Sequence, residues 1–390
     1  MMKRVCIPHE EYLERIRKAS AMTAEKGLDV LLVNSTESDY ANARYFSGFW
    51  PLFERAGVAI SAAGDAALIC GPESIKFAAD VSHIEKIYPS LYYRESANPS
   101  YPEFQASTYR DVFTGIGVRG DHLRIGVCSM LDTTVVMLEG LKECYPDAEI
   151  VDAFDMMVNL RSIKSENELA CLREGFRIAN LAMEEVRRKL RPGVTELQMV
   201  GIAQQVIYEN GAEYEGLPMY VFSEKSTTHA ISRPSYRIIE AGDLVQLNLS
   251  AKVDGYSPSI GYPVCLGKLT PEKRELVTFG LEAHQWTEKQ LKAGVLAAHI
   301  AKDYYQMFCD RGYRDHFVYG PCHGLGMIEV EAPWMESTSD YVLKKNMTFQ
   351  IDTFVSGSTF GLRWEKGVVI TEDGFESLSP PIGEIYELDV

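Results

Sequence analysis

Several features are missing from this sequence of 390 residues, and each absence excludes a class of protein. No uninterrupted apolar stretch approaches the roughly 18 residues of a membrane-spanning helix. The opening stretch MMKRVCIPHEEYLERIRK contains no apolar signal core, so we expect a cytoplasmic location. The 8 cysteines form no C-x-x-C pair, which indicates reduced thiols rather than a disulfide framework or a zinc knuckle.

Positive charge is also scarce. The chain has 39 Lys and Arg residues against 55 Asp and Glu residues, a net charge of −16. Such a chain would repel a phosphate backbone or an anionic bilayer, so we expect neither a nucleic acid nor a membrane as partner. The apolar fraction of 46% is ordinary for a globular protein, and no internal repeat or low-complexity tract is present.

The length and the order of the segments predict two domains. Residues 1–155 mix helical and strand-like segments and predict an α/β domain. Residues 156–390 begin with helical segments and continue mostly as strands, which predicts an α+β domain. Near the boundary, Ser165 and Glu168 form a capping box before a long amphipathic helix.

Four segments of the second domain place ionisable residues in apolar, strand-like surroundings. They are STTHAISRP with His229, YGPCHGLGMIEVEAPW with His323, NMTFQIDTFVSG with Asp352, and FGLRWEKGVVIT with Arg363 and Glu365. We expect Asp352 to be buried, where a carboxylate needs a partner or a proton. Arg363 and Glu365 are two residues apart and therefore lie on one face of a strand.

Each segment also has a structural alternative. A single histidine in a glycine-rich loop is more often structural than catalytic, and at least one of Glu329 and Glu331 is expected to face solvent. Arg363 and Glu365 fit a surface ion pair equally well. Cys322, beside a histidine, could be a catalytic thiol, although free cysteines are mostly small buried hydrophobes. The grouping of all four segments in one domain favours a functional site.

The order of these segments resembles the pita-bread superfamily, which includes methionine aminopeptidase, Xaa-Pro aminopeptidase, prolidase and creatinase. IIEAGDLVQLNLSAKVDGY resembles the family's first ligand hairpin, and GPCHGLGMIEVEAPW resembles its histidine-bearing loop. MTFQIDT and LRWEKGVVITEDG resemble its two glutamate segments. The resemblance implies a C-terminal pita-bread catalytic domain over residues 156–390, an N-terminal creatinase-type α/β domain over residues 1–155, and a homodimer.

Peptidases of this family bind two divalent ions through two Asp, one His and two Glu residues. The resemblance places at these positions Asn248, Ser259, His323, Asp352 and Glu365. Both hairpin ligands are therefore neutral, and an amide or a hydroxyl cannot bridge two ions as a carboxylate does. We expect no metal and no other cofactor, with a single ion on the last three residues as the remaining alternative.

Among family members, creatinase resembles this pattern best, because it works without metal and also has Asn at the first ligand position. The resemblance makes His229 the catalytic base and Arg363 a ligand of the substrate carboxylate. It assigns the same carboxylate to Phe53 and Arg55 of PLFERAG. Gly261 stands where creatinase has a glutamate that contacts the guanidinium, so creatine itself is not expected. Ectoine hydrolase, which acts on a cyclic amidine, is a comparable relative.

We therefore predict a metal-independent, creatinase-like hydrolase that cleaves a guanidino or amidine C–N bond in a small zwitterionic substrate. The predicted catalytic residues are His229, His323 and Glu365. The predicted substrate-binding residues are Asp352, Arg363, Phe53, Arg55, Asn248 and Ser259. Two alternatives remain, a metal-dependent Xaa-Pro aminopeptidase or dipeptidase and a non-catalytic homologue that binds a peptide or a protein.

Overall fold

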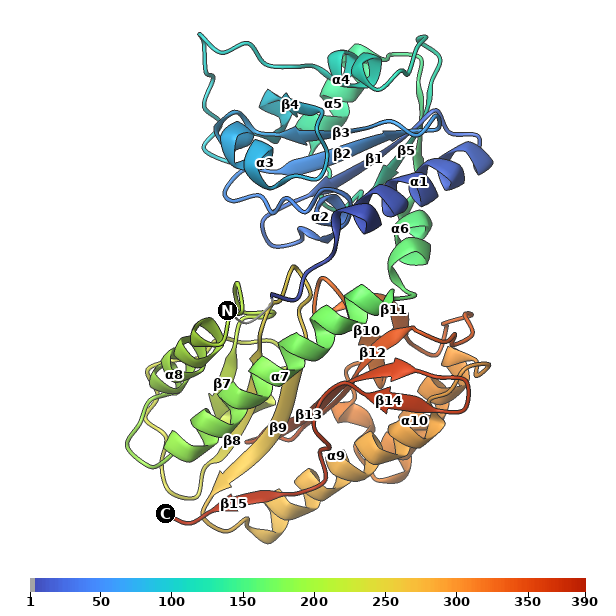
Figure 1. Ribbon diagram of the computed structural model, residues 1–390. Helices are drawn as coiled ribbons and strands as arrows, with labels where there is room; N and C mark the ends of the chain where they lie inside the picture. The colour runs from blue at the N-terminus through green and yellow to red at the C-terminus, as the bar shows by residue number, and fades with distance from the viewer. Residues whose placement is uncertain (1–3) are drawn as a thin grey trace. The chain divides into compact units, whose positions relative to one another are not determined.

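The computed structural model describes residues 4–390, which divide into two units (Figure 1). The N-terminal unit is Ile7–Arg161, and the C-terminal unit is Ser162–Val390 together with the short segment before residue 7. Residues 1–3, where the first predicted domain begins, lie outside the described part. Within residues 4–390, no helix combines the length and the apolar character needed to cross a membrane.

The N-terminal unit is a six-stranded sheet in the order β4-β3-β2-β1-β5-β6, with helices packed around it. Strand β2 pairs antiparallel with β1 and β3, and the other neighbours are parallel. The strands are β1 Val30–Ser35, β2 Ala56–Ser61, β3 Ala66–Cys70, β4 Ile87–Pro89, β5 Arg124–Cys128 and β6 Glu149–Asp152. The helices are α1 His9–Glu25, α2 Ala41–Ser47, η1 Pro72–Ser74, α3 Ile75–Val81, η2 Leu91–Tyr93, α4 Tyr109–Gly115, α5 Val135–Cys144 and α6 Phe154–Arg161.

The C-terminal unit contains a nine-stranded sheet whose main path is β11-β10-β12-β13-β9-β8-β7. Two further strands pair at its margins, β14 with β13 and β15 with β9. The strands are β7 Tyr220–Ser223, β8 Leu244–Ser250, β9 Ser259–Leu266, β10 Cys322–Gly324, β11 Glu331–Met335, β12 Thr348–Ser356, β13 Gly361–Ile370, β14 Phe375–Ser377 and β15 Tyr386–Leu388. The helices are α7 Glu166–Lys189, α8 Glu196–Glu209, η3 Glu224–Thr228, α9 Pro271–Gln290, α10 Ala297–Asp310 and η4 Arg314–His316.

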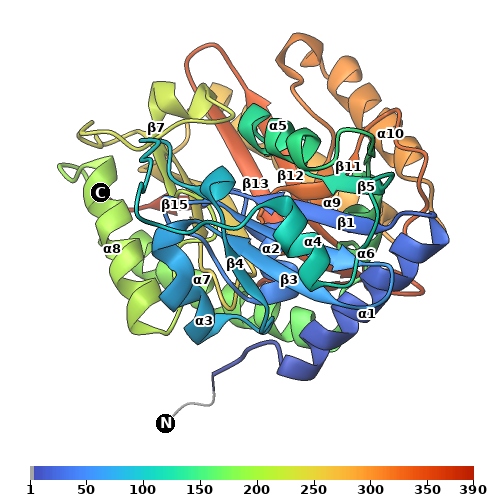
Figure 2. The same cartoon turned by 90° about the horizontal axis from the view of Figure 1, so that it is seen from above.

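Two helices of the C-terminal unit approach the sheet closely because glycine faces it. Helix α7 begins at the predicted capping box, and its Gly175 leaves no room for a Cβ against the backbone of Ala251. Gly280 of α9 lies in the same way against Leu362 and Trp364 of β13. Figure 2 shows α8 beside β7 and α10 beside β11, at opposite ends of this sheet. The middle strands β8, β9, β12 and β13 are therefore buried, and these strands carry the polar residues selected from the sequence.

Candidate active site

The hairpin of β8 and β9, predicted from the sequence, is confirmed and contributes two neutral side chains. Asn248 and Ser259 are completely buried. The amide of Asn248 donates to one oxygen of Glu365, and Ser259 Oγ donates to the other at 2.6 Å. Gly261 pairs with Asn248 across the hairpin, and a Cβ at Gly261 would overlap the Asn248 amide. The missing side chain at position 261 is therefore what allows Asn248 to reach Glu365.

Strands β12 and β13 bring three more of the predicted residues together. Asp352 lies directly opposite Glu365 in the antiparallel register, and both are buried, so the expected burial of Asp352 is confirmed. Like charges in such a pair repel. Arg363 offsets this repulsion, because its Nε lies 3.0 Å from Asp352 Oδ1 and its Nη2 donates to the Tyr319 hydroxyl at 2.8 Å. The alternative of a surface pair is wrong, since the Arg363 side chain is only 11% exposed.

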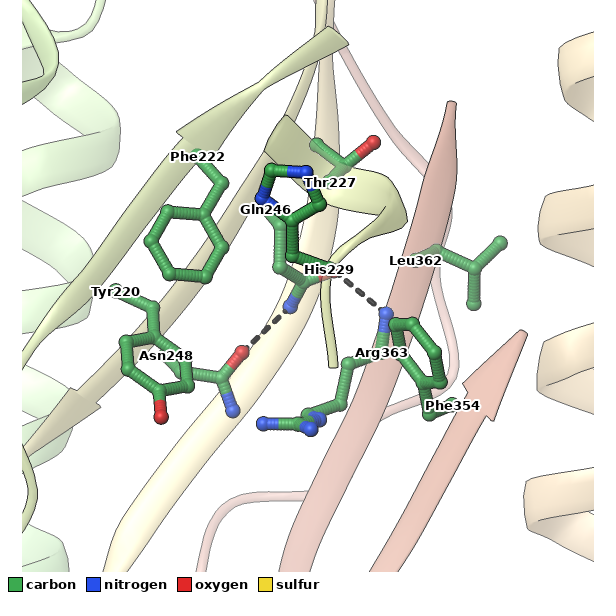
Figure 3. A pocket seen from close by; sticks show the side chains of 9 residues that line it. All are labelled: Tyr220, Phe222, Thr227, His229, Gln246, Asn248, Phe354, Leu362 and Arg363. Atoms are coloured by element: carbon green, nitrogen blue, oxygen red, sulfur yellow. Dashed lines mark hydrogen bonds between the residues drawn. The ribbon is translucent and has the colours of Figure 1, made fainter. Parts of the chain in front are cut away.

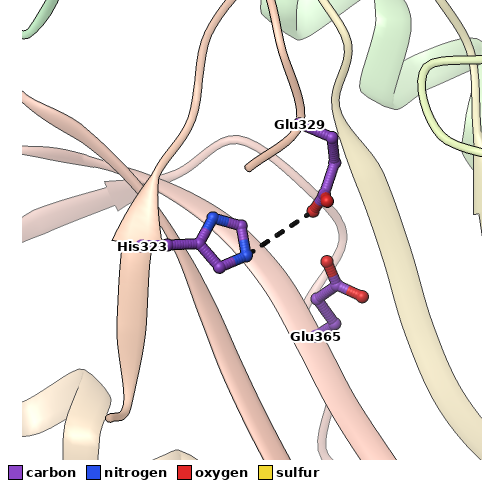
Figure 4. A group of neighbouring side chains, drawn as sticks. All are labelled: His323, Glu329 and Glu365. Atoms are coloured by element: carbon purple, nitrogen blue, oxygen red, sulfur yellow. Dashed lines mark ion pairs between the residues drawn. The ribbon is translucent and has the colours of Figure 1, made fainter. Parts of the chain in front are cut away.

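Strand β10 and the loop after it add a histidine and a third carboxylate. His323 Nδ1 donates a hydrogen bond to the carbonyl oxygen of Gly324 at 3.0 Å, because a carbonyl oxygen only accepts, and this leaves Nε2 facing the site. Nε2 points toward Glu329, whose Oε1 is 3.8 Å away (Figure 4). Asp352 Oδ2 lies 4.0 Å from the same nitrogen. An imidazole nitrogen and two carboxyl groups therefore converge at this point.

The expectation that Glu329 or Glu331 faces solvent is wrong, because each carboxylate has a buried partner. Glu331 forms an ion pair with Lys164, with Nζ 3.0 Å from Oε1. Glu329 Oε1 accepts a hydrogen bond from Ser259 Oγ at 3.3 Å. Both glutamates face the interior, Glu329 from the loop after β10 and Glu331 from the first position of β11.

Burial makes the ionisation of two site carboxyl groups unfavourable. Burial, followed by the charge of nearby Glu329, raises the pKa of Glu365 well above its usual range. Burial likewise raises the pKa of Glu329. Two carboxyl groups in contact titrate as a pair, and holding one proton between them relieves their repulsion.

Cys322 does not serve as a nucleophile. Burial raises the pKa of its thiol well above the usual range. The reactive form of cysteine is the thiolate, which a raised pKa removes at neutral pH. Cys322 packs in the apolar core of the C-terminal unit together with residues such as Met335 and Phe349.

The loop that carries His229 is tied to the sheet on both sides of the histidine. The carbonyl before His229 accepts a hydrogen bond from Ser356 Oγ at 3.2 Å. The carbonyl after it accepts one from Arg363 Nη2 at 2.8 Å. The imidazole is exposed, with Nδ1 3.1 Å from Ser232 Oγ. Arg363 therefore fixes the histidine loop as well as neutralising Asp352.

His229 and Asn248 line a small pocket (Figure 3). Arg363 forms part of its wall, and the rings of Tyr220 and Phe354 have their centres 5.8 and 5.6 Å from its guanidinium carbon. The lining therefore combines an imidazole, an amide, a guanidinium and aromatic rings.

Sequence reasoning did not select three buried polar residues that belong to this region. Gln246 donates to Asn248 Oδ1 at 2.8 Å, and Gln350 donates to Ser259 Oγ at 3.1 Å. The third is Glu329. A signal existed for the two glutamines, because each precedes a selected residue by two positions in an apolar strand and so shares its face.

Phe53 and Arg55 lie in the N-terminal unit, just before β2. Phe53 is 73% exposed and has a φ of 61°, and the backbone N–H of Arg55 donates to the carbonyl of Tyr93 at 2.9 Å. The other predicted site residues all lie in the C-terminal unit, where the structure brings them together. The substrate-binding roles of Phe53 and Arg55 stay predictions.

Two family profiles match the chain. The profile described as metallopeptidase family M24 matches residues 170–372, and that of the creatinase/prolidase N-terminal domain matches residues 15–163. The chain therefore belongs to metallopeptidase family M24, a family of hydrolases. The predicted fold class, a pita-bread domain preceded by a creatinase-type α/β domain, is confirmed.

Individual relatives add more specific similarities. An Xaa-Pro dipeptidase from Lactobacillus delbrueckii subsp. lactis is 28% identical over 66% of this chain and 71% of its own length. An uncharacterised peptidase from Bacillus subtilis (strain 168) is 25% identical over 94% of this chain and 97% of its own. The X-Pro aminopeptidase from Thermotoga maritima MSB8 superposes with a TM-score of 0.81 at 22% identity, covering 96% and 99% of the two chains. At that identity the superposition shows the fold alone.

The two-ion centre that the family name implies does not fit the residues present. Asn248 and Ser259, which the sequence resemblance places at the hairpin ligand positions, both act as hydrogen-bond donors to Glu365 and carry no charge. Asp352 is already paired with Arg363. Too little negative charge remains to offset two divalent ions in a buried site.

Proposed function

We propose that this chain is a hydrolase that cleaves a C–N bond of a small zwitterionic substrate, and that it works without a two-ion centre. The observation that supports this most directly is the pair of hydrogen bonds from Asn248 and Ser259 to Glu365. The side chains at those two hairpin positions thus donate hydrogen bonds to a carboxyl group of the protein itself. The pocket beside them, with His229 on one side and Arg363 on the other, provides the groups for proton transfer and for anchoring.

In the proposed reaction His229 acts first as base and then as acid. It takes a proton from water while the water oxygen attacks the carbon of the C–N bond, and it returns that proton to the leaving nitrogen. Histidine is the side chain that most often serves as both base and acid near neutral pH. The hydrogen bond from Arg363 to the carbonyl after His229 holds the loop in place during both steps.

The pocket lining supports a substrate with charge at both ends. The guanidinium of Arg363 offers a site for a carboxylate, and the rings of Tyr220, Phe222 and Phe354 offer faces for a delocalised cation. Glu365, predicted as catalytic, and Asp352, predicted to bind the substrate, are not among the described residues that line this pocket. A guanidino or amidine group is already polarised, which favours it where no two-ion centre activates the electrophile.

A metal-dependent Xaa-Pro dipeptidase is the second candidate. Similarity to Xaa-Pro dipeptidases from Lactobacillus delbrueckii subsp. lactis and Pyrococcus furiosus supports it, at 28% and 26% identity. These relatives support a peptide substrate more directly than they support a guanidino compound. The neutral side chains of Asn248 and Ser259 oppose the metal chemistry that this candidate needs.

One experiment separates the two candidates. The purified protein is treated with EDTA and assayed against guanidino acids, cyclic amidines and Xaa-Pro dipeptides, with and without added Mn²⁺. We expect hydrolysis of a guanidino or amidine compound that survives EDTA, and a loss of about 10²–10⁴-fold in kcat in His229→Ala. His299→Ala, which removes an exposed histidine on α10, is the matched control and should keep full activity.

Two outcomes contradict the proposal. Cleavage of Xaa-Pro dipeptides that needs two equivalents of metal and is lost to EDTA supports the dipeptidase. Tight binding of a peptide or a protein with no turnover of any compound supports the non-catalytic alternative. A cytoplasmic homodimer is proposed alongside, and light scattering of the purified protein measures its mass against the 43.8 kDa of one chain.

A further inference from the structure

The guanidinium group of Arg363 is fixed at two of its three nitrogens. Its Nη2 donates to the carbonyl of Ala230 and to the hydroxyl of Tyr319, each at 2.8 Å. Its Nε lies 3.0 Å from Asp352 Oδ1. A guanidinium has five N–H groups, so the two on Nη1 remain. Nη1 forms no hydrogen bond within residues 4–390, and it is therefore the nitrogen left for a ligand.

These contacts decide which edge of the guanidinium a substrate can reach. Arg363 lines the pocket together with Asn248, and Figure 3 shows its guanidinium reaching from β13 toward that amide. Tyr319 is not among the described residues that line the pocket. The N–H that bonds to Tyr319 is therefore used outside the pocket, and Nη1 is the nitrogen that a substrate carboxylate meets.

The backbone of Tyr319 is held by the residues that follow it in the loop between η4 and β10. A Cβ at Gly320 would overlap the carbonyl oxygen of Met335, so the loop lies directly against β11. The carbonyl of Pro321 accepts a hydrogen bond from the backbone N–H of Asp352 at 3.0 Å. Tyr319 is therefore anchored to the same strand, β12, that carries the partner of the Arg363 Nε.

The ring of Tyr319 is fixed as well. It is stacked on Phe354, with ring centres 6.2 Å apart and 20° between the planes, and it meets Trp334 edge-on at 6.1 Å. Phe354 also lies beside the guanidinium, whose carbon is 5.6 Å from the ring centre. The Tyr319 hydroxyl is therefore an acceptor in a fixed place, and its position does not depend on a bound substrate.

We propose that Tyr319 is a positioning residue that makes the pocket selective for an acid group. By accepting from Nη2, its hydroxyl turns Nη1 of Arg363 toward the pocket, where Nη1 binds a carboxylate. Tyr319 itself does not touch the substrate. This role rests on the part of the proposed function that places a carboxylate at Arg363. It is independent of the bond that is cleaved, since an Xaa-Pro dipeptide carries a carboxylate as well.

Tyr319→Phe removes the hydroxyl and keeps the ring contacts. The freed N–H of Nη2 then finds an acceptor only if the guanidinium turns, and that turn takes Nη1 away from the carboxylate. We expect the affinity for a substrate acid to fall about tenfold, because a hydrogen bond to a charged group is lost. The affinity for the carboxamide of the same compound should not change, since the amide has no charge for Nη1 to neutralise.

The test measures binding in EDTA by isothermal calorimetry, with guanidinoacetate, the dipeptide Ala-Pro and the carboxamide of each as probes. We expect the parent to bind one acid about tenfold more tightly than its carboxamide, and Tyr319→Phe to bind the two equally. For a probe that the parent hydrolyses, KM takes the place of the dissociation constant, and kcat should change much less than KM. The matched control is Tyr341→Phe, because the buried hydroxyl of Tyr341 has no hydrogen-bond partner in the described chain.

Each result separates the role of Tyr319 from the proposed function. The same acid preference in the parent and in Tyr319→Phe, or no preference in the parent, overturns that role and leaves the hydrolysis of guanidino compounds standing. A preference for Ala-Pro that Tyr319→Phe loses supports the role and contradicts the guanidino substrate. The same pattern with guanidinoacetate supports both.

Two further variants complete the test. In an Arg363→Met background, Tyr319→Phe should cause no additional loss of affinity for the acid. An additional loss would mean that Tyr319 acts on the substrate directly, which overturns the positioning role. If Tyr319→Phe does not fold by circular dichroism, Tyr319→Leu, which also lacks the hydroxyl, takes its place.

Discussion

Two buried regions of the C-terminal unit differ in how many hydrogen-bond donors surround their carboxyl groups. Glu196, at the start of α8, is completely buried and accepts five hydrogen bonds. They come from Ser223, Ser226 and Ser235, at distances between 2.6 and 3.1 Å. In the site, Glu329 and Glu365 share Ser259 as a donor, Asn248 also donates to Glu365, and His323 Nε2 lies 3.8 Å from Glu329 Oε1.

This difference distinguishes a structural carboxylate from one that is available to bind a proton or a ligand. Around Glu196 the protein has supplied a donor for every available direction, so nothing further can bind there. Around Glu329 a single hydroxyl, that of Ser259, is shared between two carboxyl groups. A buried excess of acceptors costs free energy unless a proton, a metal ion or a substrate supplies what is missing. The three predictions below test this contrast, starting with the largest effect.

Glu196→Ala should have the largest effect on stability. It removes an acceptor from two backbone N–H groups and three hydroxyls, of which only the Ser223 N–H and the Ser226 hydroxyl keep a second one, and we expect a loss of about 3–5 kcal/mol in the free energy of unfolding. Glu196→Gln keeps one acceptor oxygen and should lose less. Urea denaturation followed by circular dichroism measures both. If Glu196→Ala costs no more than Glu329→Gln does, the contrast between the two regions is wrong.

The histidine loop gives Glu196→Ala a second readout. Ser223 and Ser235 lie on either side of His229 in the sequence, and Glu196 joins them. We therefore expect a fall in kcat in the part of the protein that stays folded. An unchanged kcat would mean that Arg363 and Ser356 suffice to hold the loop.

Asn248→Asp tests the site from the other side, by adding an acceptor. The new carboxylate would lie against Glu365, where the amide now donates a hydrogen bond. We expect a loss of about 2–3 kcal/mol at neutral pH in EDTA, and partial recovery with Mn²⁺, since the ion would then lie among more carboxylates. Asn180→Asp is the matched control, because Asn180 also donates to a glutamate, Glu184 at 2.8 Å, but at the surface.

The measurement is the melting temperature with and without Mn²⁺. Stabilisation by the ion that is larger in Asn248→Asp than in the parent is the expected result. Equal melting temperatures for Asn248→Asp and the parent in EDTA would mean that the interior accepts the extra charge at no cost. That result would remove the argument against a two-ion centre.

Much of this arrangement could be predicted from the sequence, because apolar strands interrupted by single polar residues are rare. That signal selected Asp352, Arg363 and Glu365, and the order of the segments gave the family fold. It could not indicate that Arg363 pairs with Asp352, since cross-strand partners depend on the register of β12 and β13. Nor could it give the direction of Glu329, because that depends on how the loop after β10 turns.

Gly261 illustrates the same limit. In the sequence it was a missing glutamate and so a reason to exclude creatine. In the structure, the Asn248 amide fills the space that a side chain at position 261 would take, and from there it donates to Glu365. The absence of one side chain and the position of another are a single structural feature, and only the pairing of Asn248 with Gly261 connects them.

The smallest expected effect is on the pH dependence of stability, and it concerns Glu329. Burial raises the pKa of Glu329 and of Glu365 above their usual value of 4.5. A carboxyl group with a raised pKa in the folded state binds its proton more tightly there than in the unfolded chain. Its contribution to stability is therefore fully present below about pH 4.5 and is lost as the pH rises through the folded-state pKa.

Glu329→Gln removes one of the two groups and, with it, the charge that raises the pKa of Glu365. In EDTA the variant should therefore lose less stability than the parent between pH 5 and pH 8, by about 1 kcal/mol, since one pKa unit corresponds to about 1.4 kcal/mol. Urea denaturation at several pH values measures the difference, with Glu336→Gln as the exposed control. Parallel pH curves for the parent and Glu329→Gln would mean that the two carboxyl groups do not share a proton. The excess of acceptors at the site would then already be compensated within the chain, as it is around Glu196.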